Sequence, residues 1–225
     1  TVKIHGDRGK ILLGCGAAGG IAASFNAPLG GVVFAVEVIL GELEASTFIP
    51  IVIAAVFATL VSNTVFGVRT IQVSDYELVS PFYESILYLI LGICAGIVAV
   101  ILMRFLNITH DSFQELDIHP IVKPAAGGIL VGLIGYFYPQ VFGVGYDVIT
   151  DALTNNLALN LMIALIFLKI VAFSFTLGSG GSGGSIVPAL FTGAMLGGAY
   201  GTIVHAAFPG ITAESGAYAL AGMGA

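Results

Sequence analysis

Long apolar stretches alternate with short polar ones along the whole chain. A transmembrane helix needs about 20 mostly apolar residues. The pattern predicts a span from Phe48 to Phe66, a long helix over residues 81–105, and further spans over residues 124–138, 157–177 and 189–205. A last apolar helix begins near Ala213. The hydrophobic pattern therefore predicts an all-α polytopic membrane protein.

Two shorter apolar stretches precede these spans. Residues 11–25 and the segment from Leu29 to Leu40 are separated by Asn26-Ala27-Pro28, which breaks a helix. Neither stretch reaches the length of a span, so we predict two short helices joined inside the membrane. Glu42 and Glu44 mark a polar exit after the second helix.

The polar connections predict the orientation in the membrane. Residues 104–123 form the most polar stretch, and residues 67–80 include a strand-like segment at 70–73. If the two short helices make a round trip, residues 1–10 and 104–123 lie on one side and residues 67–80 on the other. The first side carries five basic residues, Lys3, Arg8, Lys10, Arg104 and Lys123, and the second carries Arg69. The excess of Lys and Arg predicts that residues 1–10 and 104–123 are cytoplasmic.

Composition supports an integral membrane protein. The chain is 57% hydrophobic and 9% charged, and its mean hydropathy is +1.03, whereas soluble domains are about 25% charged. The two cysteines, Cys15 and Cys94, lie in apolar stretches and predict no disulfide framework. The four histidines are scattered without ligand spacing, so we predict no metal and no cofactor. The predicted partners are the lipid bilayer and a small anion, not nucleic acid.

A loop of glycine and serine at residues 177–187 carries the candidate chemistry. It lies between two apolar stretches, and Pro188 suits the first turn of a following helix. Amides at a helix start lack partners and sit at the positive end of the helix dipole, so they bind anions without a basic side chain. We predict an anion site at Gly184, Ser185, Ile186 and Val187, with an ordinary interhelical loop as the alternative.

Several other residues allow two interpretations. Glu37 lies in an apolar stretch, where a carboxylate is either functional or a structural partner near the membrane face. Lys169 lies inside residues 157–177, where it either raises the potential for an anion or serves structure by reaching the interface or pairing with a carboxylate. Small residues at spacings of four, such as Gly193, Gly197 and Gly201, predict close helix packing.

Four stretches together resemble the family of chloride channels and chloride/proton antiporters (CLC). The segment from Gly14 to Glu37 is similar to the helix pair that follows the gating-glutamate loop of that family. Residues 184–188 resemble its Gly-x-Phe-x-Pro anion loop, with Ile186 where Phe is usual. Residues 143–147 and 221–225 are also similar to family stretches.

The resemblance implies a CLC-type inverted-repeat fold and a homodimer with one pore per subunit. It implies that the amides of Ile186 and Val187 contact a chloride ion, with bromide as a substitute. It also implies a dimer interface built from the helices Leu29 to Leu40 and Phe48 to Phe66. On this basis residues 1–225 form the central part of the transmembrane domain, with about eight or nine helices, several of them short or re-entrant.

The resemblance also implies that family elements lie outside this sequence. The first anion loop and the gating-glutamate loop are expected upstream and the pore tyrosine downstream, so the fold is expected to be incomplete at both ends. Val38 occupies the position where many antiporters of the family carry a proton-handling glutamate. This difference favours a passive channel, with a chloride/proton antiporter as the alternative and Glu37 as a candidate for a proton or gating role.

Two explanations from other classes remain to be tested. Gly180-Gly181-Ser182-Gly183 matches the Gly-x-Ser-Gly pattern of rhomboid-type intramembrane serine proteases, whose serine needs a histidine within hydrogen-bond reach. His205 is the downstream histidine, and about 17 helical residues separate it from Pro188, or roughly 25 Å. This spacing argues against an enzyme. The second explanation is a carrier for a larger anion that uses the same helix-terminus site.

Overall fold

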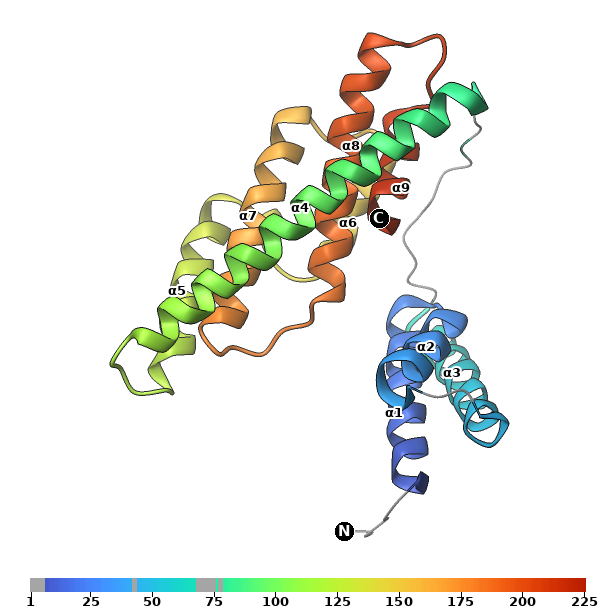
Figure 1. Ribbon diagram of the computed structural model, residues 1–225, viewed down its shortest axis with the longest axis vertical. Helices are drawn as coiled ribbons and strands as arrows, with labels where there is room; N and C mark the ends of the chain where they lie inside the picture. Colours follow the sequence, from blue (N-terminus) through green and yellow to red (C-terminus); the bar gives the residue numbers. More distant parts are fainter. Residues whose placement is uncertain (1–6, 42–43, 68–75, 77–78) are drawn as a thin grey trace. The chain divides into compact units, whose positions relative to one another are not determined.

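The computed structural model describes residues 7–41, 44–67, 76 and 79–225 as a set of helices (Figure 1). These helices fall into two compact units, residues 1–70 and 71–225. The first unit holds α1 (Asp7–Phe25), α2 (Pro28–Phe34), the π-helix η1 (Ala35–Leu40) and α3 (Ala45–Phe66). The second holds α4 (Pro81–Glu115), α5 (Val122–Phe137), the 3₁₀ turn η2 (Pro139–Val141), α6 (Tyr146–Leu153), α7 (Leu159–Gly178), α8 (Ile186–Ala207) and α9 (Ser215–Gly224).

Small residues hold the first unit together. A Cβ at Gly31 on α2 would overlap the carbonyl of Ala18 on α1, and Gly19 approaches Ala54 and Ala58 on α3. Without side chains between them the backbones come close, as is common where helices pack in lipid. Asn26, with a φ of 52°, ends α1, and its side-chain oxygen accepts a hydrogen bond from Asn63 on α3 at 2.8 Å. The break predicted at Asn26-Ala27-Pro28 is confirmed.

The second unit contains the longest helix. α4 runs 35 residues, about 52 Å at 1.5 Å per residue, which exceeds the roughly 30 Å of a hydrocarbon core. We predicted that this helix ends at Phe105, and that boundary is wrong by ten residues. The continuation includes polar positions such as His110 and Asp111, and both are exposed.

The membrane spans agree in part with the prediction. Four helices are long and apolar enough to cross a bilayer: α3, α4, α7 and α8. α5 has 16 residues, so the predicted span over residues 124–138 is shorter than a full crossing by length. The strand-like segment at 70–73 lies outside the described residues, as do the first six residues of the predicted cytoplasmic segment 1–10.

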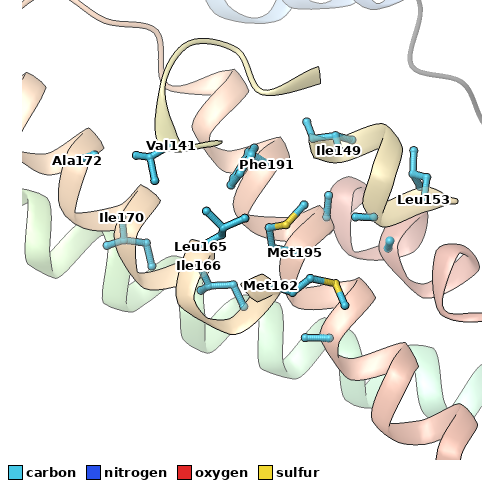
Figure 2. Close-up of a cluster of buried hydrophobic side chains, with 14 residues drawn as sticks. Val141, Ile149, Leu153, Met162, Leu165, Ile166, Ile170, Ala172, Phe191 and Met195 are labelled. Atoms are coloured by element: carbon cyan, nitrogen blue, oxygen red, sulfur yellow. The ribbon is translucent and has the colours of Figure 1, made fainter. Parts of the chain in front are cut away.

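The main core lies between α6, α7 and α8 (Figure 2). Ile149 and Leu153 of α6 belong to one cluster with Met162 and Leu165 of α7, and all four are almost completely buried. Phe191 and Met195 extend the same cluster from α8. This core fixes where α8 begins, and therefore where the predicted anion site lies.

The α8 ridge of glycines packs against α9. Cβ atoms at Gly193, Gly197 and Gly201 would overlap Gly222, Tyr218 and Ser215 respectively. The packing role is thus confirmed for this ridge. Other glycine pairs four residues apart, at 16 and 20, 92 and 96, and 128 and 132, lack such a neighbour, because a Cβ at any of them meets nothing within 4 Å in the described part of the chain.

Candidate functional site

The loop before α8 begins with backbone hydrogen bonds that cap the C-terminal end of α7. The N–H groups of Ser179, Gly180 and Gly181 donate to carbonyls of the last turn of α7 at 3.2, 3.0 and 2.9 Å. Gly180 has a φ of +90°, a conformation that favours glycine. The backbone then turns away from α7, and Ser182 to Ser185 are exposed. This turn lets the chain enter α8 as a separate helix.

The first turn of α8 presents two amides without a protein partner among the described residues. Ile186 and Val187 are its first two residues, and Pro188 has no N–H to offer. Ala189 donates to Ser185 at 3.2 Å, and no side chain caps the helix. Free amides at a helix start combine donor groups with the positive end of the dipole. The predicted helix start at the Gly/Ser loop is therefore confirmed, and its chemistry suits an anion.

A cavity of about 630 Å³ lies at this helix start. Its walls include Ser185 and Ile186 from the start of α8, and Gly222 and Met223 from the end of α9. Gly184 and Val187 are not among the residues that line it, although Gly184 is exposed and a Cβ there would meet nothing within 4 Å. The lining residues carry no ionisable side chain. An ion in this cavity would meet backbone dipoles, the hydroxyls of Ser185 and Thr192, and apolar groups, but no charged side chain.

One face of α4 supplies a further wall of this cavity, which the sequence pattern does not identify. The residues concerned are Ala95, Val98, Ala99, Leu102, Met103 and Leu106. Their spacing of three and four residues places them on one helical face. The sequence of α4 does show a periodic apolar face, but a helix face directed at lipid has the same spacing.

Lys169 has a structural role in this unit. It is 5% exposed, and its Nζ donates to the carbonyls of Val141 at 2.8 Å and Gly143 at 3.0 Å. The ammonium also lies 4.6 Å from the centre of the Phe191 ring, a favourable cation–π distance. The structural interpretation is therefore confirmed, although the partners are carbonyls and not the carboxylate that we considered.

Glu37 and Val38 lie in the other unit. Both are in η1 and both are exposed, with Val38 at 63%. Gly41, with a φ of +72°, ends this helix by donating to the carbonyl of Val36. The roles of Glu37 and Val38 thus stay predictions.

The protease arrangement is absent from the described residues. Ser182 lies in the loop before α8, and His205 lies in the last turn of that helix, roughly 28 Å along its axis from Ile186. His205 is instead within 3.2 Å of the hydroxyl of Thr212. A serine nucleophile needs its base within hydrogen-bond reach, so this pair forms no dyad.

A sequence model of one family, described as "Voltage gated chloride channel", matches residues 2–225. The chain belongs to the voltage-gated chloride channel (CLC) family. It is 33% identical over 217 residues to a putative chloride channel protein ClcB-like from Ralstonia nicotianae, with 96% of this chain and 50% of the relative covered. It is 34% identical over 210 residues to the voltage-gated ClC-type chloride channel ClcB of Escherichia coli O9:H4, with 89% and 48% covered. This CLC chain thus spans about half the length of the curated relatives it matches.

Two solved structures share the fold of this chain. The fold resembles a slow cyanobacterial Cl⁻/H⁺ antiporter with a TM-score of 0.83 and 25% identity, covering 96% of this chain and 51% of the other. It also resembles a eukaryotic CLC transporter with a TM-score of 0.73, at 22% identity over 95% of this chain and 36% of the other. The CLC chain is therefore a multi-pass membrane protein, and the elements of its described residues are helices, as predicted.

Proposed function

We propose that this chain forms part of a chloride pathway across a membrane. The observation that carries the proposal is the start of α8. There the amides of Ile186 and Val187 have no partner among the described residues, and Ile186 lines a cavity without charged side chains. Gly184 and Ser185 precede them and complete the proposed chloride site. The printed names of the relatives, chloride channels and a Cl⁻/H⁺ antiporter, support chloride as the ion.

The chemistry of this site suits a chloride ion that passes through better than one that is held tightly. A chloride ion must lose water to enter, and amide dipoles at a helix start replace part of that hydration. A lysine or arginine in the site would bind the ion more tightly, but conduction requires binding weak enough to release it. Ser185 adds a hydroxyl donor at the cavity wall. The apolar remainder of the wall gives these dipoles a low-dielectric setting.

We favour a passive channel over a chloride/proton antiporter. The reason is Val38, which has no ionisable group at the position where the family resemblance expects a proton-handling glutamate. Glu37, next to it, remains the candidate if protons are carried. The antiporter alternative keeps the chloride site unchanged and differs only in its coupling.

The remaining parts of the proposal come from the family resemblance. The other half of the relatives' length would supply the further walls of the pathway and its gate. The exposed apolar residues of α2, η1 and α3, such as Leu29 and Phe57, suit a homodimer interface as well as lipid. Bromide is expected to replace chloride, and residues 1–10 and 104–123 are expected to face the cytoplasm.

The test is chloride efflux from liposomes containing the purified product of the full gene. Valinomycin is added to carry potassium, with and without a proton ionophore. Efflux that needs only valinomycin supports a channel, whereas efflux that also needs the ionophore supports an antiporter and contradicts our interpretation of Val38. No efflux above empty vesicles, from protein that is folded by size-exclusion chromatography, contradicts chloride transport. Saturable uptake of a larger anion in its place would support the carrier alternative.

A further inference from the structure

A carboxylate and a phenol, both completely buried, lie in one cluster near the first turn of α4. Glu84 on α4 and Tyr218 on α9 are each 0% exposed. Among the described residues, neither Oε2 of Glu84 nor the hydroxyl of Tyr218 has a hydrogen-bond partner. Buried polar atoms without partners are rare in native proteins, and each one calls for a physical explanation.

The packing around them brings the two side chains together. Oε1 of Glu84 accepts a hydrogen bond from the backbone N–H of Ala213, which lies five residues before Tyr218. Tyr88 lies one turn after Glu84 on the same face of α4. Its ring stacks on that of Tyr218, with the ring centres 4.8 Å apart.

The two unsatisfied atoms have complementary hydrogen-bonding capacity. A carboxylate oxygen accepts, and a phenol can donate. No direct hydrogen bond joins them, and both are already sealed from solvent by this chain. A further protein segment therefore cannot reach them, so the missing partner must be a small molecule enclosed within the cluster.

We propose that a water molecule is bound between Glu84 and Tyr218. The water donates one hydrogen to Oε2 of Glu84 and accepts the hydrogen of the Tyr218 hydroxyl, so both buried groups are satisfied. Buried waters typically make two to four such bonds to otherwise unsatisfied groups. A metal ion fits less well, because no group of three His, Cys, Asp or Glu side chains that could hold one occurs among the described residues.

This water would join α4 to α9 across their interface. Four to six residues after Tyr218, the end of α9 lines the 630 Å³ cavity with Gly222, Met223 and Gly224. The bound water therefore helps to fix one wall of that cavity. The inference rests on burial and hydrogen bonding alone, and it holds whatever ion the protein transports.

The test combines a density map with a double-mutant cycle on the intact protein. A high-resolution cryo-electron microscopy map should show a density peak within hydrogen-bond distance of both atoms. Glu84→Leu and Tyr218→Phe each take away a group that can bond to the water, so each should destabilise the protein to thermal unfolding. The double variant should be destabilised less than the product of the two single effects on the unfolding equilibrium, by about threefold or more, since both substitutions remove the same bridge.

Tyr200→Phe is the matched control. The Tyr200 hydroxyl donates directly to the carbonyl of Leu87 at 3.0 Å and needs no water. The effects of Tyr200→Phe and Glu84→Leu on the unfolding equilibrium should therefore multiply. A map that resolves the neighbouring side chains but lacks the peak overturns the proposal, even if the variants fail to fold. Independent effects of Glu84→Leu and Tyr218→Phe also overturn it. If the thermal stability changes when sodium replaces potassium at constant ionic strength, the bound species is a cation and not a water molecule.

Discussion

Gly197 on α8 lies directly against the carbonyl group of Tyr218 on α9. A Cβ at Gly197 would overlap the carbonyl oxygen and lie 2.8 Å from the carbonyl carbon. Both neighbours are backbone atoms, which cannot move aside as a flexible side chain can. Only glycine allows this contact, and the contact holds the end of α9 at the cavity.

Gly197→Ala is therefore expected to destabilise the protein by about 1–3 kcal/mol, the usual cost of an overfilled core. It should also lower chloride transport, because α9 would shift at the cavity. The measurement is thermal unfolding in detergent. Gly128→Ala on α5 is the control, since a Cβ there meets nothing within 4 Å and alanine favours a helix. Equal stability of the two variants would contradict the close packing of α8 on α9.

Lys169 offers a second prediction, which separates structure from electrostatics. Lys169→Met keeps much of the side-chain volume but leaves the carbonyls of Val141 and Gly143 without their donor. A buried acceptor left unsatisfied costs about 1–3 kcal/mol, so the variant should unfold at lower temperature. Chloride affinity, measured by isothermal titration calorimetry below that temperature, should stay unchanged. A lower affinity in a folded Lys169→Met protein would instead favour the electrostatic role. Lys169→Arg, which keeps the donor, is the control.

The sequence predicted a helix boundary well where neighbouring residues determine it. Pro188 and the glycines before it indicated a helix start, and the structure has α8 begin at Ile186. The end of α4 was predicted poorly, because Arg104 begins a polar stretch. Helix formation there depends on backbone hydrogen bonds, to which apolarity contributes nothing. The hydroxyls of Thr109 and Ser112 bond to carbonyls four residues earlier in the same helix.

Tertiary features were harder to predict because they depend on partners distant in sequence. The wall formed by Ala99 and Leu102 has the same pattern as a face directed at lipid. Glycine ridges on α5 and α8 have the same spacing, yet the described residues give only the α8 ridge a neighbouring helix. Glu84 resembled an ordinary residue of a first helical turn until Ala213, 129 residues later, was found to bond to it.

Asn155 makes a third prediction. It has a φ of 59°, and its side-chain oxygen accepts hydrogen bonds from Ser215 and from the N–H of Gly216, at the start of α9. Its amide nitrogen donates to Glu214 at 2.8 Å. Asn155→Ala loses these bonds and adds strain, and loss of a helix cap costs about 1 kcal/mol. Asn155→Gly loses the same bonds but relieves the backbone, so it should unfold at a higher temperature than Asn155→Ala. The opposite order would contradict this account.

Val187 carries the most local prediction for the chloride site. Val187→Pro removes one of the two unpartnered amides, and proline is tolerated in the first turn of a helix. Chloride or bromide binding should fall with little loss of stability, as measured by isothermal titration calorimetry and thermal unfolding. Val187→Ala keeps the amide and changes only the side chain, so it should bind as the unchanged protein does. Unchanged binding in a well-folded Val187→Pro protein would exclude this amide from the site.

Ala99 tests whether the cavity belongs to the chloride pathway. It lines the cavity from α4, and Ser185 and Ile186 line the same cavity at the start of α8. Ala99→Trp places a large side chain in a space of about 630 Å³, which has room for it. The fold should therefore survive while chloride efflux from liposomes falls about tenfold or more, since an ion cannot pass a filled constriction. Ile97→Trp is the matched control, because Ile97 is two residues away, 57% exposed, and does not line the cavity. If both variants transport chloride at the original rate, the ion takes a route that avoids this cavity. A loss in both would indicate damage to α4 itself, so only a loss confined to Ala99→Trp supports the pathway.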